Sequence, residues 1–443
     1  MDATLLRRYR EAIRGGEQAD GGAVDLPSRR RYNALLRRWR RHPGVGRRDV
    51  AVVGGAYAVD RARRRTMRMV ERGKLRHDET GESFSPDGVA TGAAAPSVAV
   101  SADGLTVASG SDYRDVRVWD LRRGANKSLA HAMMDGNDDG DEVRAIALAS
   151  SRRALPDLVA SAHDDGSIKL WEANPLAARS LDADEASLDV AERRGTSAYH
   201  TFERAHGAFV ANGLALSAAG TRLLSGGGDG TVRLWDVDFL RRRLTVFEGH
   251  RGSVNGVDAS SDGRLCISGG DDKTVRAWDP RARGGAVLTL EVAGSRDRKA
   301  GEVCGVALAA DDGTLASAER SGNDDGGVRI WDLRRADAPR HSLGLGKMQS
   351  VVVALSADGR LAASGHRPLV LPRAAASRPE PLRLWDAASG ALLERVSQMH
   401  EAPSGVAMSD DGGTLACVGT SPSGAYRTGF DDLNYVQVWR NET

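Results

Sequence analysis

Histidine, serine and aspartate, the side chains of a hydrolase triad, recur together at two places in the chain. The two groups are His206, Ser225, Asp229 and His250, Ser268, Asp272. In a triad the histidine takes the proton of the serine nucleophile and the carboxylate orients the ring. Here the same order and nearly the same spacing occur twice, which is more typical of a repeated structural element than of one active site. We therefore expect no catalytic residues among them.

Two other kinds of site are also disfavoured. The glycine-rich segment 226–230 (Gly-Gly-Gly-Asp-Gly) is not followed by the Gly-Lys-Ser/Thr and helix of a phosphate-binding loop. The ten histidines and three cysteines show no metal-ligand spacing. We therefore expect no metal and no cofactor, and we do not expect an enzyme.

Tryptophan marks an internal repeat. Seven short segments that alternate apolar and polar residues, as in Val232-Arg-Leu-Trp235, end in a tryptophan. These residues are Trp119, Trp171, Trp235, Trp278, Trp331, Trp385 and Trp439. Such alternation predicts a β-strand. A further alternating segment with an Asp-Gly turn lies upstream in several units, as in 353–359, so each unit predicts a four-stranded antiparallel sheet.

These motifs resemble the WD-repeat β-propeller family. Trp-Asp stands at 119–120, 235–236, 278–279, 331–332 and 385–386, and Gly-His at 249–250. The resemblance covers about 97–443 and implies an all-β fold with seven blades. It also implies a structural role for two complete hydrogen-bonded sets, which are His206, Ser225, Asp229, Trp235 and His250, Ser268, Asp272, Trp278.

In this family the residues just before each inner strand face the upper mouth of the central channel. Here they are Pro96, Arg144, Asn212, Asn255, Cys304, Val351 and Ser404. Two long turns, 366–381 and 420–435, belong to the same face in the family. The resemblance therefore implies a partner-binding upper face with Arg144, Asn212, Asn255, Arg367, Arg373, Tyr426 and Arg427 as candidates.

The pattern Trp-Asp-x-Arg is shared with substrate receptors of cullin-RING ubiquitin ligases. It places Arg122, Arg281 and Arg334 as candidate contacts to a ligase adaptor. The pattern also arises readily in a chain with 56 arginines, so a general WD-repeat scaffold remains open beside this interpretation.

The chain divides into a basic extension, 1–75, and a propeller, 76–443. Four residues follow Trp439, so we expect a segment within 76–90 to supply the last strand of the last blade, with 76–96 as lead-in. The extension shows helical spacing around 5–13, 28–41 and 56–72. One face of the second helix carries Tyr32, Leu35, Leu36 and Trp39, which would pack on the propeller or dock in a groove of a partner.

Charge separates the same two parts. Residues 1–76 carry 21 Lys/Arg and 8 Asp/Glu, a net charge of +13, and the remainder carries −11. Such an arm could contact nucleic acid, an anionic membrane or an acidic partner, or lie on the acidic body of the same chain. The chain has no run of 18 apolar residues, so the sequence does not predict a membrane-spanning helix. Three widely spaced cysteines favour free thiols inside the cell, in the cytoplasm or nucleus.

The leading expectation is a non-catalytic scaffold that binds other proteins or peptides as a monomeric propeller within a complex. Two alternatives stay open, a substrate receptor of a cullin-RING ligase and an RNA- or chromatin-associated propeller that uses its basic arm. The alternatives differ in partner and in the salt dependence of binding.

Overall fold

The computed structural model describes most of the repeat region and one segment ahead of it. The described residues are 69–76, 97–110, 116–121, 131–133, 143–149, 157–173, 198, 200–218, 220–237, 242–282, 285–292, 301–310, 313–320, 327–335, 338–344, 348–368, 382–396, 402–420 and 435–441. The helices expected around 5–13 and 28–41, with Tyr32, Leu35, Leu36 and Trp39, lie outside these residues.

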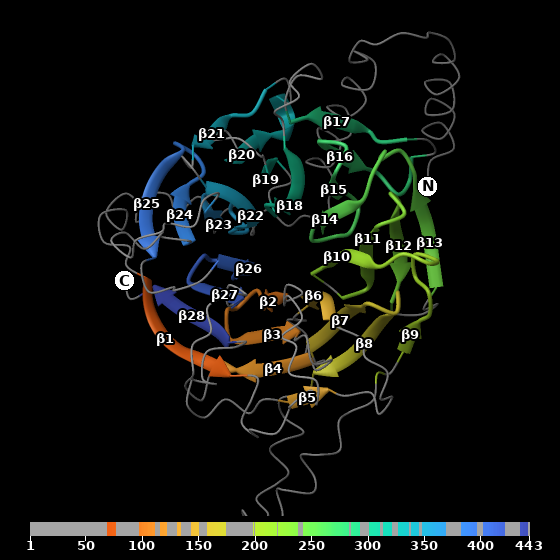
Figure 1. Cartoon of the computed structure of the whole chain (residues 1–443), viewed down its shortest axis with the longest axis horizontal. Helices are drawn as coiled ribbons and strands as arrows, with labels where there is room; N and C mark the ends of the chain where they lie inside the picture. Colours follow the sequence, from red (N-terminus) through yellow and green to blue (C-terminus); the bar gives the residue numbers. More distant parts are fainter. Residues whose placement is uncertain are drawn as a thin grey trace, which may run out of the picture. The chain divides into compact units, whose positions relative to one another are not determined.

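Within the described residues, 28 strands form seven antiparallel four-stranded sheets, which we number as blades 1 to 7 (Figure 1). Blade 1 contains β2 (Val98–Val100), β3 (Thr106–Gly110), β4 (Val116–Asp120) and β5 (His131–Met133). Blade 2 contains β6 (Val143–Ala149), β7 (Asp157–His163), β8 (Ile168–Ala173) and β9 (His200–Phe202). Blade 3 contains β10 (Ala211–Leu216), β11 (Arg222–Gly227), β12 (Val232–Asp236) and β13 (Arg242–Phe247).

The remaining blades follow the same order. Blade 4 contains β14 (Val254–Ala259), β15 (Cys266–Gly270), β16 (Thr274–Trp278) and β17 (Leu288–Glu291). Blade 5 contains β18 (Glu302–Leu308), β19 (Thr314–Arg320), β20 (Gly327–Asp332), the short 3-10 helix η5 (Leu333–Arg335) and β21 (His341–Gly344). Blade 6 contains β22 (Met348–Leu355), β23 (Leu361–Pro368), β24 (Leu382–Asp386) and β25 (Ala391–Val396). Blade 7 contains β26 (Ala402–Met408), β27 (Thr414–Thr420), β28 (Tyr435–Asn441) and β1 (Met69–Arg76).

The alternation read from the sequence becomes alternation of burial. On β12, Val232, Leu234 and Trp235 are buried while Arg233 is partly exposed. The Asp-Gly turns also form as expected, with Gly263 at φ 65° and Gly359 at φ 66°, a conformation that glycine adopts without strain. The all-β fold with seven antiparallel blades is therefore confirmed.

The hydrophobic core lies between blades. Trp235 of blade 3 packs with Ala160, Ile168 and Leu170 of blade 2, and Trp439 of blade 7 packs with Leu382 and Leu384 of blade 6. A single blade cannot bury both faces of its sheet, so the blades gain stability only from their neighbours.

The ring closes where blade 7 meets blade 1. Trp119 of blade 1 clusters with Val418, Val436 and Val438 of blade 7, and the Asp410 amide donates to the Ala102 carbonyl at 3.1 Å. Seven blades thus surround a central channel, towards which the inner strands β2, β6, β10, β14, β18, β22 and β26 face (Figure 1).

The strand that completes blade 7 is β1, which pairs with β28 from Met69↔Asn441 to Arg76↔Tyr435 (Figure 1). A segment ahead of the first repeat therefore does supply the fourth strand. Its expected position within 76–90 was wrong, and the helix expected at 56–72 cannot extend through 69–72. The edge of β28 that does not pair with β27 carries backbone donors and acceptors, and β1 satisfies them by pairing along it.

No helix among the described residues is long and apolar enough to cross a membrane.

Candidate functional site

The two complete His–Ser–Asp–Trp sets form the hydrogen-bonded networks that the resemblance implies. In blade 3, the Trp235 indole donates to Ser225 Oγ at 2.9 Å and Ser225 Oγ lies 2.8 Å from His206 Nε2. His206 Nδ1 lies 3.0 Å from Asp229 Oδ1. Blade 4 repeats these contacts. Ser225 is 0% exposed, so no substrate can reach it, and the network is structural.

Burial and hydrogen bonding hold this network in one protonation state. Burial lowers the pKa of His206, because the charged ring would lose its hydration. Burial would raise the pKa of Asp229, but hydrogen bonds from Thr231 and His206 outweigh it, and the pKa lies below its usual value. The neutral ring then donates through Nδ1 to the carboxylate and accepts the serine hydroxyl at Nε2.

Blades 2 and 6 build the same network from a histidine at another place. His163 and His366 lie two residues after the serine on the same strand, with Nε2 at 2.7 and 2.8 Å from Ser161 and Ser364 Oγ. Blade 3 has Gly227 at that position, where a Cβ would overlap the ring of His206. A histidine ring therefore lies beside the serine in all these blades, and it comes either from the second strand or from the segment before the first strand. His163 and His366 were not among the residues expected from the sequence, although the Ser-x-His spacing in these strands indicates them.

Among the described residues, blades 5 and 7 have no histidine beside the tryptophan-bonded position of the second strand and differ further from the network of blades 3 and 4. Glu319 takes the place of the ring in blade 5, where it accepts from Ser317 Oγ at 3.4 Å and pairs with Arg329. Burial raises the pKa of Glu319 to about 7 despite that arginine. In blade 7 the serine is replaced by Cys417, and the buried Trp439 Nε1 has no hydrogen-bond partner among the described residues.

A second set of residues converges on the channel. Six inner strands each contain a β-bulge, which adds one residue near the strand start. The extra residues are Arg144, Asn212, Asn255, Cys304, Val351 and Ser404. They stand at the register deduced from the sequence, and Pro96 lies outside the described residues.

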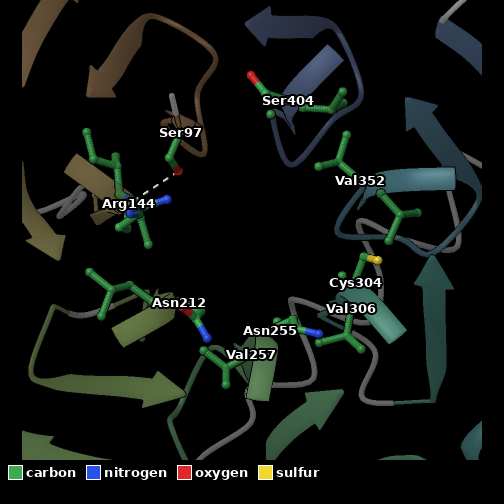
Figure 2. Close-up of a pocket in the computed structure, with 18 of the residues that line it drawn as sticks. Ser97, Arg144, Asn212, Asn255, Val257, Cys304, Val306, Val352 and Ser404 are labelled. Atoms are coloured by element: carbon green, nitrogen blue, oxygen red, sulfur yellow. Dashed lines mark hydrogen bonds between the residues drawn. The ribbon is translucent and has the colours of Figure 1, made fainter. Parts of the chain in front are cut away.

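Five of them, Arg144, Asn212, Asn255, Cys304 and Ser404, line a cavity of about 350 Å³ together with Ser97 and Arg320 (Figure 2). We refer to this end of the channel, where the inner strands begin, as the channel mouth. A bulge turns a side chain out of the regular ladder, so these residues face the channel instead of the core.

Two asparagines at the mouth are fixed by neighbouring blades. Asn212 Nδ2 donates to Ser253 Oγ at 3.3 Å and to the Val254 carbonyl at 3.2 Å. Asn255 Nδ2 donates to Asp271 Oδ1 at 2.7 Å and to the Val303 carbonyl at 3.0 Å. In blades 3 to 5 a glycine follows each bulge residue, and a Cβ on Gly256 would lie 2.9 Å from Gly305 Cα. Glycine thus lets the inner strands approach closely enough for these contacts.

The two arginines at the mouth are held by carboxylates. Arg144 Nη2 donates to Asp164 Oδ2 at 2.9 Å, and Arg320 pairs with Glu302. Their side chains remain 40% and 55% exposed. The mouth therefore presents charged groups whose positions are set before any partner arrives.

Below the mouth, one aliphatic residue from each blade forms a ring that we name the aliphatic collar. Its members are Val98, Ile146, Leu214, Val257, Val306, Val353 and Val406, and all line the same cavity. Each lies opposite the serine or cysteine that faces the tryptophan in its own blade.

Three segments, 90–120, 197–236 and 241–279, match the family model described as "WD domain, G-beta repeat". These WD repeats and the seven four-stranded blades together support a WD-repeat β-propeller family for the chain. No curated protein matches the chain significantly. Two of the matched segments contain the first three strands of blades 3 and 4, together with the complete network of each blade. Blades 2, 5, 6 and 7 replace parts of this network.

The remaining candidate residues of this WD-repeat protein are divided between the two faces. Arg367 lies in β23, at the mouth end of blade 6. Arg373, Tyr426, Arg427 and Arg122 lie outside the described residues. Arg281 and Arg334 follow β16 and β20, and therefore lie at the end opposite the mouth, where the inner strands stop.

Both arginines make local contacts. The Arg281 guanidinium donates to Asp279 at 3.0 and 3.2 Å, with its side chain 51% exposed. Arg334 is exposed, and its guanidinium lies directly over Gly313. The structure does not bring these residues together with Arg144, Asn212 and Asn255.

Proposed function

We propose that this WD-repeat propeller is a protein-interaction scaffold whose channel mouth binds a segment of a partner protein. WD-repeat propellers are typically non-catalytic scaffolds. The observation that supports the mouth is the set of β-bulges at the starts of the inner strands, because five of them direct one residue each from the ladder towards a shared cavity.

The contacts at the mouth favour binding by preorganisation. Asn212 and Asn255 are clamped by the next blade, and Arg144 and Arg320 are oriented by Asp164 and Glu302. Side chains that are already ordered lose little entropy when a partner binds. All three cysteines are free thiols, which fits the intracellular location that we propose.

The test is affinity purification from the native source followed by mass spectrometry. Cys304→Trp introduces a bulky side chain at the mouth, and Arg264→Trp introduces the same group at an exposed turn after β14, at the opposite end. We expect partners to be lost with Cys304→Trp and retained with Arg264→Trp. Equal recovery with both folded variants would contradict binding at the mouth.

A cullin-RING substrate receptor is the second proposal, supported by the half-exposed guanidinium of Arg281. The double variant Arg281→Ala, Arg334→Ala should then lose a ligase adaptor while partners of the mouth remain. Retention of the adaptor by this variant would exclude that contact.

The basic arm supports the third proposal, which is contact with RNA or chromatin. Recovery of nucleic-acid-binding proteins should then fall steeply with salt and require residues 1–60. Salt-independent recovery, or recovery without those residues, would contradict it.

A further inference from the structure

The channel mouth presents cations to its cavity and keeps the matching carboxylates outside it. Arg144 and Arg320 line the cavity, whereas the carboxylates that orient them, on Asp164 and Glu302, do not. No acidic side chain is among the described residues that line it. The two arginines come from blades 2 and 5, which lie on nearly opposite sides of the ring (Figure 1). The cavity between them therefore favours a negatively charged group.

The arginines are able to bind such a group while they keep their present partners. Arg320 uses Nη2 for Glu302, and a guanidinium has five N–H donors. Ser97 lies beside Arg144 at the rim of the cavity (Figure 2). Its Oγ accepts the backbone N–H of Ile146 at 3.0 Å, so its own O–H can be directed to a ligand oxygen. A carboxylate placed here would accept from a hydroxyl and from a guanidinium that Asp164 already orders.

Below this cationic rim the channel wall has two apolar layers. The first layer is the aliphatic collar. The second, which we name the lower ring, lies two residues further along each inner strand and therefore on the same face of the strand as the collar. Its members are Val100, Leu148, Leu216, Ala259, Leu308, Leu355 and Met408, and each stays partly exposed although it is apolar. The channel thus offers an apolar surface that begins where the charged groups end.

One carboxylate occurs at the same depth, but it belongs to the seam between blades 4 and 5. Asp258 lies between Val257 of the collar and Ala259 of the lower ring, and so on the other face of β14, where the other six blades have alanine. It accepts the backbone N–H of Leu308 at 2.7 Å and that of Ala259 at 2.8 Å, and no cation is paired with it among the described residues. Its oxygens are therefore engaged within the wall, and it does not line the mouth cavity.

The shape of the channel favours a thin chain without polar groups. Neighbouring inner strands approach closely in blades 3 to 5, where a Cβ on Gly213 would lie 3.1 Å from the carbonyl oxygen of Asn255. A peptide segment between the apolar layers would bury backbone N–H and C=O groups without hydrogen-bond partners. An unbranched acyl chain has no such groups to satisfy.

We propose that the channel mouth binds a free aliphatic carboxylate. Its carboxylate lies at Ser97 and Arg144, facing Arg320, and its unbranched chain extends through the aliphatic collar to the lower ring. Arg144 and Leu148 are four residues apart on β6, about 13 Å along the strand, which matches an extended chain of about ten carbons. The ligand is a small molecule, so the inference goes beyond the partner segment proposed for the mouth.

Two series of probes test the tail and the head separately on the full chain. Butanoate, hexanoate, octanoate and decanoate share the carboxylate, and affinity should rise along the series because each buried methylene contributes up to about fourfold. Octanoate, 1-octanol and octylammonium share the tail, and octanoate should bind at least about tenfold more tightly than the other two. In methyl NMR spectra, all four carboxylates should shift Ile146 of the collar, and only the longer ones should shift Met408 of the lower ring.

Charge variants at the mouth should change octanoate affinity in opposite directions. Arg320→Gln should weaken binding about threefold, whereas Glu302→Gln removes a carboxylate that competes for Arg320 and should strengthen binding by a similar factor. Arg281→Gln is the matched control, because Arg281 is equally exposed and paired with an aspartate at the opposite end of the channel. Cys304→Trp should abolish binding and Arg264→Trp should not, with thermal melting as the check on folding.

Four results would overturn the proposal. They are equal affinity for octanoate and 1-octanol, equal affinity for butanoate and decanoate, and octanoate affinity that Arg320→Gln and Arg281→Gln change equally. The fourth is tighter binding of acetyl-Gly-Gly-norleucine, with a free terminal carboxylate, than of octanoate, because the ligand would then be the end of a peptide.

The partner purification separates this inference from the proposed function. Octanoate binding that is lost in Cys304→Trp supports the inference whether or not partners are lost with that variant. Loss of partners with Cys304→Trp, combined with no octanoate binding to the wild type at about 10 mM, ten times a millimolar Kd, would overturn the inference and leave the mouth as the partner site.

Discussion

The unpartnered indole of blade 7 predicts that a single substitution will stabilise the ring. In five blades the tryptophan N–H donates to a serine hydroxyl at 2.7–2.9 Å, as Trp385 does to Ser364. Cys417 occupies the same register opposite β28, and both it and Trp439 are 0% exposed. Cys417→Ser places a hydroxyl where the indole N–H points.

The expected change in the free energy of unfolding follows from two groups, the indole N–H of Trp439 and the side chain at position 417. A buried donor without a partner costs about 1–3 kcal/mol, and the new hydrogen bond removes that cost. Replacing the thiol by a hydroxyl loses apolar burial, which offsets part of the gain. The new hydroxyl can donate to the Val418 carbonyl, as the thiol now does at 3.7 Å. We expect a net stabilisation of about 1 kcal/mol.

Urea unfolding followed by tryptophan fluorescence measures the change, provided that the slope with denaturant is unaltered. Cys266→Ser is the matched control, because Cys266 is equally buried but the nearby indole of Trp278 already donates to Ser268. The control should destabilise by about 1–3 kcal/mol. If Cys417→Ser destabilised as much as Cys266→Ser, or left the indole proton resonance of Trp439 unchanged, the hydrogen-bond reasoning would be refuted.

Other predictions concern the blade network, the closing strand and Asp258. Trp278→Ala should destabilise by about 3–5 kcal/mol in urea unfolding, and a loss below about 1 kcal/mol would contradict its core position. Ser268→Ala, which leaves the Trp278 indole and His250 without their shared hydroxyl, should cost about 1–3 kcal/mol in the same assay. Deletion of residues 1–60 should preserve the β-sheet circular dichroism and the melting temperature. Deletion of residues 1–76 also removes β1 and should lower the melting temperature. Equal melting temperatures of the two truncated proteins would show that β1 does not close the ring. Because burial raises the folded-state pKa of Asp258 to about 6, the folded state holds more protons between about pH 4 and 6, and its contribution to stability falls as the pH rises through that window. Asp258→Ala should remove this slope and unfold at higher urea than wild type at pH 8; an unchanged slope would mean that the carboxyl does not titrate in that range.

The sequence alone determined the architecture, because its signals are local and repeated. Alternation before each tryptophan and Asp-Gly turns such as 262–263 specify antiparallel strands wherever they occur. The register of the inner strands followed from aligning the repeats, and this placed Arg144, Asn212 and Asn255 at equivalent positions before the structure showed the bulges there.

Only the tertiary structure decided what completes each local pattern. The closing strand was misplaced because β1 has no repeat signature, and its position is fixed by the free edge of β28. His163 and Glu319 replace the loop histidine from another strand position, which is visible only when the side chains meet the serine in space. Asp258 stands among six alanines in the sequence, but its burial, its bond to Leu308 and the lack of a described counter-ion arise from the seam between two blades. A repeat encodes its own strands, whereas channel, closure and charge compensation depend on neighbours that meet only when seven blades form a ring.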